Sequence, residues 1–227
     1  MTASPVVIRH VARGAVLVAS ASLSEELVQR GITQVRRWTR GIDHWLFRPH
    51  GDFHPAIVNL PRPILLNVGR VASEKNLEAF LDADAPGTKV VVGDGPARAG
   101  LQAKFPEARF LGKKTGEALA GCYAHADVFV FPSRTDTFGL VMIEALACGT
   151  PVAAFPVAGP LDIVTDAVGA LSDNLTRAID AARYCDRAAC AAYGASYSWE
   201  AATRQFLSGL VALQEQQTVS LTAAPAF

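Results

Sequence analysis

The 227-residue sequence lacks the features that mark several classes of protein. Its four cysteines include no Cys-x-x-Cys pair, so we expect reduced thiols in place of a disulfide framework or a zinc site. Lys and Arg number 21 and Asp and Glu also number 21, and this balance argues against a nucleic-acid-binding protein. No apolar run approaches membrane-spanning length, and the first residues lack the apolar core of a signal peptide. A cytoplasmic protein is predicted.

Several catalytic and metal-binding motifs are also missing. The five histidines form no metal-binding pair on a helix, because His50 and His54 stand four apart in a proline-flanked loop, and no metal site is predicted. Neither a Gly-x-Ser-x-Gly element nor a P-loop occurs, so hydrolase and P-loop functions lack support. The stretch VVGDGP at 91–96 approaches a dinucleotide-binding Gly-x-Gly-x-x-Gly motif, but Arg98 replaces the third glycine.

Short apolar runs alternate with helical segments along most of the chain, in which half of the residues are hydrophobic. This alternation predicts an α/β fold with a doubly wound, Rossmann-like parallel sheet over residues 15–213, after an ambiguous segment 1–14 and before a flexible tail 214–227. A polar loop is predicted at 50–63, and Ser22 or Ser24 is expected to cap the first helix. The predicted strands are 15–19, 33–38, 64–68, 89–92, 108–111, 128–131 and 152–155.

The stretch 128–152 has the pattern of a phosphate-binding strand, turn and helix. A buried strand is expected at 128–131 and a helix from about 138 to 148, whose first turn would present backbone N–H groups to an anion. Asp136 precedes this helix and Glu144 lies inside it, and carboxylates are natural acceptors for sugar hydroxyls. Alternatively, Asp136 only caps the helix. Glu144, alone in an apolar helix, must find a polar partner.

Glycine-bearing turns at 69 and 93 follow two further predicted strands and are expected to converge with the turn at 139 on one edge of the sheet. Arg70 and Lys75 follow the first of these strands and could both reach a diphosphate, although two basic residues in a loop are more often solvated surface. The GDGP turn, taken by itself, could be a plain tight turn. The candidate residues in these turns are Gly69, Arg70, Lys75, Gly93 and Gly95.

The spacing of Asp136 and Glu144 resembles the Glu-x7-Glu element of retaining glycosyltransferases of GT-B architecture, in the family called group 1 or family 4, with Asp in place of the first Glu. The resemblance spans about residues 15–213. It implies that Asp136 and the backbone of the Phe138-Gly139-Leu140 segment contact the donor sugar and that Glu144 contacts the ribose. It also implies that Arg70 and Lys75 neutralise the diphosphate, so Asp136, Arg70 and Lys75 are the expected catalytic residues.

The family also implies the ligands and partners. The donor would be a UDP- or GDP-sugar, the turns at Gly93, Gly95, Gly112 and Lys113 would lie near the nucleotide, and neither a cofactor nor a metal ion would be needed. A hexose such as mannose or glucose would pass to a lipid, glycan or small acceptor, which leaves open peripheral association with the inner membrane face. A Gly-x-x-Asp element ends at Asp162, which we interpret as a cap or surface residue.

The resemblance covers only the C-terminal, donor-binding half of a GT-B enzyme. We therefore expect the N-terminal acceptor domain to be absent, the isolated chain to be inactive, and the exposed apolar surface to cause self-association. The alternative hypotheses are a non-catalytic nucleotide-sugar-binding or regulatory module, and a subunit of a split transferase whose partner supplies the first domain. An epimerase of related architecture fits the motif spacing less well.

Overall fold

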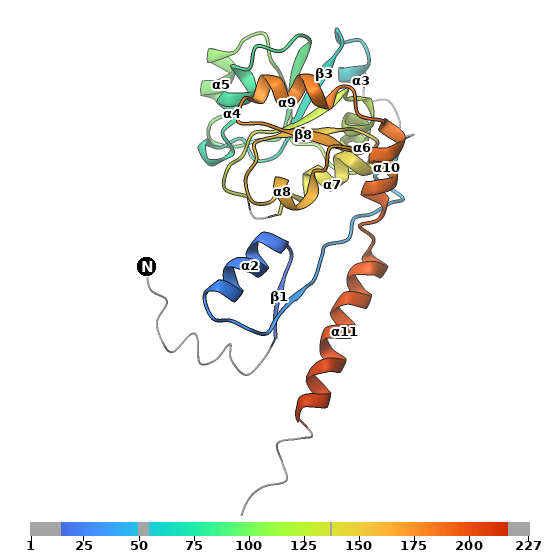
Figure 1. Ribbon diagram of the computed structural model, residues 1–227. Coiled ribbons are helices and arrows are strands. Elements are labelled where there is room, and N and C mark those ends of the chain that lie inside the picture. The colour runs from blue at the N-terminus through green and yellow to red at the C-terminus, as the bar shows by residue number, and fades with distance from the viewer. Residues whose placement is uncertain (1–14, 50–54, 137, 218–227) are drawn as a thin grey trace, which may run out of the picture. The chain divides into compact units, whose positions relative to one another are not determined.

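The computed structural model describes residues 15–49, 55–136 and 138–217, with side chains described as far as Ser208 (Figure 1). The chain divides into two compact units. One comprises Met1–Gly41 with Ser198–Phe227, and the other comprises Ile42–Tyr197. Both boundaries fall inside the predicted domain 15–213. The predicted segment 1–14 and residues 218–227 of the predicted tail lie outside the described residues.

The larger unit contains a six-stranded sheet in which every neighbouring pair of strands is parallel. The order is β5-β4-β3-β6-β7-β8. From β3 the successive strands are added on one side of the sheet, and from β6 they are added on the other side. This is the 3-2-1-4-5-6 order of a Rossmann-like sheet, and it confirms the predicted doubly wound fold. The strands are β3 (Ile64–Val68), β4 (Thr88–Val92), β5 (Arg109–Gly112), β6 (Val128–Phe131), β7 (Val152–Ala154) and β8 (Gly169–Leu171).

The central strands form where the sequence has apolar, β-branched runs. β3 is buried over its first four residues, and all four residues of β6 are buried, as expected for strands covered on both faces. The sequence analysis missed β8, because its three residues Gly-Ala-Leu carry no strand propensity. Its pairing with β7 is a tertiary effect at the edge of the sheet.

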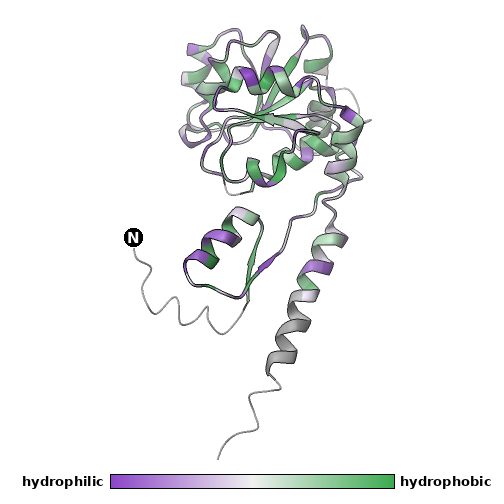
Figure 2. Cartoon of the chain, viewed as in Figure 1, coloured by the Kyte–Doolittle hydropathy of each residue, from purple (hydrophilic) through white to green (hydrophobic). Residues whose placement is uncertain are grey.

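Helices cover both faces of this sheet. On one face, α4 (Leu77–Leu81), α5 (Arg98–Lys104) and α9 (Leu175–Ala182) contribute to a continuous apolar core with side chains of β3, β4, β6 and β7. On the other face, α6 (Gly116–His125) packs on β3, and α7 (Leu140–Ala147) packs on β6 and β7. Figure 2 shows the predominantly hydrophobic colouring of the strands and of α7.

Two outer helices and two short helices complete this unit. α10 (Arg187–Ala195) packs on α7, and its first turn is capped by the side chain of Asp186. α3 (Pro55–Val58) packs on α6, so the predicted polar loop 50–63 is wrong in part, because its apolar Ile57 is fully buried. The short helices that adjoin the loops of the site are η1 (Ser73–Lys75) and α8 (Pro160–Ile163).

The smaller unit has a two-stranded parallel sheet of β1 (Val16–Val18) and β2 (Val35–Arg37), with α2 (Ala21–Gln29) between the strands in sequence. The N-cap of α2 is Ser20, whose hydroxyl accepts from the Leu23 N–H, so the predicted capping by Ser22 or Ser24 is wrong. The long helix α11 (Trp199–Gln217) belongs to the same unit. The ring of its Phe206 lies 5.4 Å from that of Trp38.

All four cysteines are free thiols. In the described part of the chain, no three His, Cys, Asp or Glu side chains are grouped as metal ligands would be. Within the same described ranges, no helix combines the length and the apolar character that crossing a membrane requires.

Candidate functional site

The two loops that flank the switch point of the sheet meet through an ion pair. β3 and β6 are neighbouring strands at the centre of the sheet. The chain passes from β3 to β4 on one side and from β6 to β7 on the other side. Crevices at such switch points bind ligands in open α/β sheets. Lys75, from the loop after β3, donates to Asp136, from the loop after β6, with 2.6 Å between Nζ and Oδ1. The side chains are 29% and 25% exposed, so the pair is partly shielded yet reachable from solvent.

This pairing corrects the alternative view of Asp136 as a helix cap. The N-cap position of α7 is Gly139, and no side chain of the described residues caps that helix. Gly139 has a left-handed φ of 82°, and a Cβ there would lie 2.7 Å from the terminal carbon of Met142. The first turn of α7 therefore begins on an uncapped glycine at the carboxyl edge of the sheet, where an anion could approach its backbone N–H groups.

Two asparagines that the sequence analysis missed hold the β3 side of the switch point against the β6 side. Asn67, 6% exposed, donates through Nδ2 to the Val130 carbonyl at 2.9 Å. Asn76 has a left-handed φ of 53° and donates to the Pro132 carbonyl at 3.0 Å. These bonds connect β3 and the residue after Lys75 to the strand and turn that precede Asp136. No sequence pattern signalled them, because their acceptors are backbone atoms more than 50 residues away.

The glycine turns after β3 and β4 lie in direct contact. The Gly69 N–H donates to the Val92 carbonyl at 3.0 Å, and a Cβ on Gly93 would lie only 1.8 Å from the Gly69 oxygen. A Cβ on Gly95 would similarly lie 2.3 Å from the Val71 oxygen. The two turns thus approach each other more closely than any residue with a side chain would allow, which explains the glycines of the GDGP segment.

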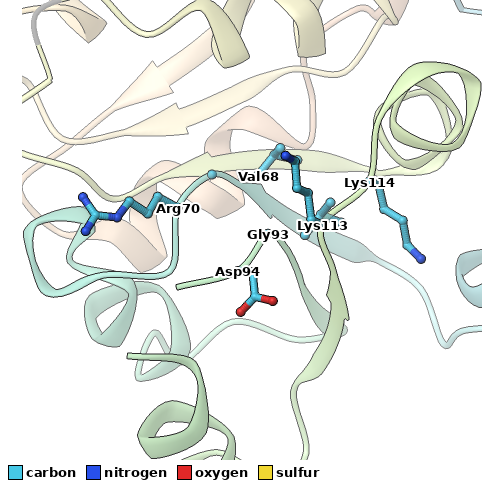
Figure 3. Close-up of a pocket in the computed structure, with 8 residues that line it drawn as sticks. Val68, Arg70, Gly93, Asp94, Lys113 and Lys114 are labelled. Atoms are coloured by element: carbon cyan, nitrogen blue, oxygen red, sulfur yellow. The ribbon is translucent and has the colours of Figure 1, made fainter. Parts of the chain in front are cut away.

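A pocket of about 300 Å³ opens beyond the carboxyl ends of β3, β4 and β5 (Figure 3). We call it the strand-end pocket. Gly93 also donates its N–H to the Gly112 carbonyl, which ties the third strand end to the second. The turns predicted at 69, 93 and 139 follow the neighbouring parallel strands β3, β4 and β6, so their predicted convergence at one edge is confirmed. The residues that line the strand-end pocket are Val68, Gly69, Arg70, Val92, Gly93, Asp94, Lys113 and Lys114.

Three cations and one carboxylate line the strand-end pocket. Figure 3 shows the Arg70 and Lys114 side chains extending in opposite directions with Lys113 between them. Arg70 is 65% exposed and pairs with Glu74 at 3.2 Å, and the carboxylate of Asp94 lies 3.4 Å from Arg98. Among the described residues, neither lysine has an ion-pair partner, so both remain available to an anionic ligand.

Glu144 has the polar partner that its apolar helix requires. The hydroxyl of Tyr123 in α6 donates to its Oε2 at 2.9 Å, and Tyr123 is fully buried beside the rings of Phe47 and Phe129. Burial raises the pKa of Glu144, whereas the hydrogen bond from Tyr123 lowers it. Burial likewise raises the pKa of Tyr123, so its hydroxyl stays protonated and donates at neutral pH. The sequence analysis missed Tyr123, since nothing local relates α6 to α7.

The predicted residues do not all line one pocket. The strand-end pocket is lined by Gly69, Arg70, Gly93 and Lys113. Lys75 pairs with Asp136 at the switch point. Glu144 lies about one turn inside α7. The remaining candidates occupy the start of α7 and the neighbouring turns. There Phe138 is buried, Leu140 is 41% exposed, and Asp162 lies half-buried in the first turn of α8. Gly112, with a left-handed φ of 72°, ends β5 and accepts the N–H of Gly93.

Known proteins are similar to this chain in both sequence and fold. The family model "Glycosyl transferases group 1" matches residues 62–188. The chain is 40% identical over 164 residues to a GDP-mannose-dependent alpha-mannosyltransferase of Mycobacterium tuberculosis, covering 69% of this chain and 43% of that protein. It is 35% identical over 210 residues to a protein of the same name from Corynebacterium glutamicum, covering 84% and 51%.

Among solved structures, sucrose-phosphate synthase from Thermosynechococcus elongatus superposes with a TM-score of 0.73 at 29% identity, covering 90% of this chain and 59% of that one. The chain thus spans about half the length of the relatives that it matches. Because the family model covers more than half of the sequence, and because the sheet has the matching fold, the chain belongs to the group 1 glycosyl transferases.

Proposed function

We propose that this chain forms the donor site of a retaining hexosyltransferase and binds a nucleoside-diphosphate sugar at the carboxyl edge of its larger sheet. The observation that carries the proposal is the ion pair between Lys75 and Asp136 across the switch point, because it brings the two predicted catalytic loops together. The adjacent strand-end pocket supplies cations for a diphosphate.

Each candidate residue has a role that its chemistry supports. Arg70 and Lys75 would neutralise the charge that develops on the leaving diphosphate, together with the start of α7 at Gly139. Asp136 would accept hydrogen bonds from sugar hydroxyls while Lys75 holds its carboxylate in place. Glu144 would accept from ribose hydroxyls, with one carboxylate oxygen already oriented by Tyr123.

The names of the relatives favour one donor among the expected UDP- and GDP-sugars. Both mannosyltransferases described above are named as GDP-mannose-dependent, so we propose GDP-mannose as the first donor to test. The acceptor would be a lipid, a glycan or a small molecule. If it is a lipid, a cytoplasmic protein would work peripherally at the inner membrane face.

We also propose that the isolated chain binds nucleotide but transfers sugar poorly. Binding needs only the strand ends and the start of α7, whereas transfer needs an acceptor held in line with the sugar carbon. Such positioning can account for roughly 7–11 kcal/mol of barrier lowering. The matched segments make up only 43% and 51% of these relatives, and their remaining residues could supply that positioning.

Calorimetric titration with GDP, UDP, ADP and GDP-mannose tests the proposal. We expect one diphosphate to bind saturably, and Glu144→Ala to weaken that binding by about 1.5–3 kcal/mol, which corresponds to a charged hydrogen bond. Glu25→Ala, an exposed glutamate of α2, is the matched control and should leave affinity unchanged.

Absence of binding by every nucleotide would defeat the proposal, and an unchanged affinity of correctly folded Glu144→Ala would defeat the ribose assignment. A transfer assay with the bound donor then separates the remaining alternatives. Multiple turnovers by the isolated chain would show that it is a complete enzyme. Transfer that appears only after a second polypeptide is added would indicate a split transferase. Binding without transfer, both by the chain alone and with the second polypeptide, would indicate a regulatory module.

A further inference from the structure

A second cavity lies at the opposite edge of the larger sheet. It has a volume of about 350 Å³, and three of its lining residues immediately precede strands: Pro63 before β3, Asp127 before β6 and Pro151 before β7. The strand-end pocket is instead lined by residues at the ends of β3, β4 and β5 and in the turns that follow them. Since all the strands run parallel, the two cavities open at opposite edges.

The second cavity carries an excess of positive charge. Arg62, Arg183 and Arg187 line it together with one carboxylate, Asp127, and we call it the arginine cavity. Asp127 is already engaged at both oxygens, since Oδ1 lies 2.6 Å from Arg62 and Oδ2 accepts the Ile64 N–H at 2.6 Å. The carboxylate therefore balances one arginine and leaves two.

The other two arginines have weak counter-charges or none. Among the described residues, Arg183 pairs only with Asp180, a helix neighbour that is 66% exposed, at 3.7 Å, and such surface pairs are weak. In the described part of the chain, no carboxylate forms an ion pair with Arg187. Partial burial lowers the pKa of Arg187, Asp127 raises it, and the nearby charge of Arg62 lowers it. Arg62 and Arg187 thus repel each other at the cavity, and a bound anion would relieve that repulsion.

Two of the guanidinium groups are fixed in orientation before any ligand binds. Arg187 donates to the carbonyls of Ala126 and Ala124 at 2.7 and 2.8 Å, and Arg62 donates to the His125 carbonyl at 3.1 Å. Both arginines are therefore held on the last turn of α6 and the residue after it. Each guanidinium has five N–H donors, so N–H groups remain for a ligand. A preorganised cation loses less conformational entropy on binding than a free side chain.

We propose that the arginine cavity is a second ligand site, which binds the phosphate group of a phosphorylated small molecule or of a phospholipid headgroup. The planar, forked guanidinium matches phosphate oxygens in pairs, which a lysine cluster would not do. The capping of α6 accounts for the carbonyl contacts of Arg62 and Arg187. It does not account for Arg183, whose ion pair in the described part of the chain is with Asp180 and not with Asp127. Arg183 is therefore the residue that separates ligand binding from helix capping.

Calorimetric titration with inorganic phosphate, against sodium chloride of equal ionic strength, tests this site. We expect saturable binding by the full chain and a loss of affinity of about tenfold or more in Arg183→Gln, equivalent to one charged hydrogen bond. Arg177→Gln is the matched control, because it removes the same charge from an exposed position of α9 and should leave affinity unchanged.

A second comparison assigns the binding to the correct cavity. Phosphate could also bind at the strand-end pocket, so Arg70→Gln is titrated in parallel and should retain the binding that Arg183→Gln loses. Three results would overturn the proposal: no saturable binding, equal losses in Arg183→Gln and Arg177→Gln, or a loss confined to Arg70→Gln. None of these results depends on the donor-site proposal, which is tested with nucleotides.

Vesicle sedimentation distinguishes the two sources of phosphate. If the ligand is a headgroup, the chain should sediment with phosphatidylglycerol vesicles and not with phosphatidylcholine vesicles, and Arg183→Gln should reduce that sedimentation. If the ligand is a soluble phosphate ester, phosphate binding should depend on Arg183 while neither vesicle carries the chain down. Sedimentation that is equal in Arg183→Gln and Arg177→Gln would reflect general charge attraction and count against a defined site.

Discussion

At the scale of single residues, Glu144 shows how a fold accommodates a carboxylate inside an apolar helix. Its helix is otherwise apolar, and burial raises its pKa, so the charged form is held less favourably than in water. The hydroxyl of Tyr123 offsets part of that cost and fixes one of the two oxygens. If Glu144 holds ribose hydroxyls as proposed, Tyr123 acts as its positioning residue.

We therefore expect Tyr123→Phe to weaken nucleotide binding by about 0.5–1.5 kcal/mol at neutral pH, the usual contribution of one hydrogen bond. The change should also shift the pH dependence. The hydrogen bond lowers the pKa of Glu144, so its loss raises that pKa, and protonation begins at a higher pH. As pH falls, affinity should therefore decline earlier in Tyr123→Phe than in the wild type. Titration of nucleotide binding between neutral and acidic pH measures this shift.

Tyr184→Phe is the matched control for this experiment, because Tyr184 is 81% exposed and lies outside the donor site. It should reproduce the wild-type pH profile. If Tyr123→Phe weakens binding equally at every pH, the hydroxyl stabilises the fold without tuning Glu144. If the wild type binds no nucleotide, the donor-site proposal itself is wrong.

At the scale of elements, the turns after β3 and β4 set the geometry of the strand-end pocket. They are held together by backbone hydrogen bonds, of which Val71 N–H to the Asp94 carbonyl at 2.9 Å is one. The close approach of Gly93 to the Gly69 oxygen leaves no space for a side chain. The pocket therefore depends on glycine at this position for a steric reason that the flanking residues cannot relieve.

Substitution by alanine should therefore change the free energy of unfolding in opposite directions at a glycine of this turn and at a glycine inside α5. Gly93→Ala should lower the free energy of unfolding by more than about 2 kcal/mol, because the new methyl group meets backbone atoms that cannot move independently. Gly100→Ala should raise it by about 0.5–1 kcal/mol, because Gly100 lies inside α5 with no atom near the added methyl group. Urea denaturation measures both changes, and a neutral effect of Gly93→Ala would contradict this account of the turns.

Secondary structure was predicted well where the local pattern decides it. The predicted strands 64–68 and 128–131 match β3 and β6 residue for residue, because each is a dense apolar run that must be buried on both faces. β8 and α3 were not predicted, since their short segments are stabilised by the neighbours on which they pack. The predicted extent of a single domain over 15–213 stays a prediction.

At the scale of the whole molecule, each of the two units exposes large apolar side chains. Trp45 and Leu161 of the larger unit are 86% and 57% exposed, and Trp199 and Leu207 of the smaller unit are 57% and 52% exposed. Such side chains are often covered by a partner when they gather in patches. We therefore retain the expectation that the chain self-associates, most simply as a two-fold dimer.

Light scattering across a concentration series should show a molecular mass that rises from that of the monomer toward twice that value. Trp45→Ser and Trp199→Ser, prepared separately, should reveal which unit carries the contact, since only the relevant change should restore the monomer. Val58→Ser removes a smaller exposed apolar side chain and serves as the control. A constant monomer mass at high concentration would contradict the prediction.

The sequence by itself determined the α/β class, most strand positions and the residue types of the candidate site. These follow from local patterns: apolar runs, glycine turns, and two carboxylates eight residues apart. Only the tertiary structure decided which of those residues meet. Lys75 pairs with Asp136 because β3 and β6 are neighbours at the switch point, and Glu144 meets Tyr123 because α6 and α7 share one face. Strand order and helix packing depend on burial between distant segments, and no local pattern encodes them.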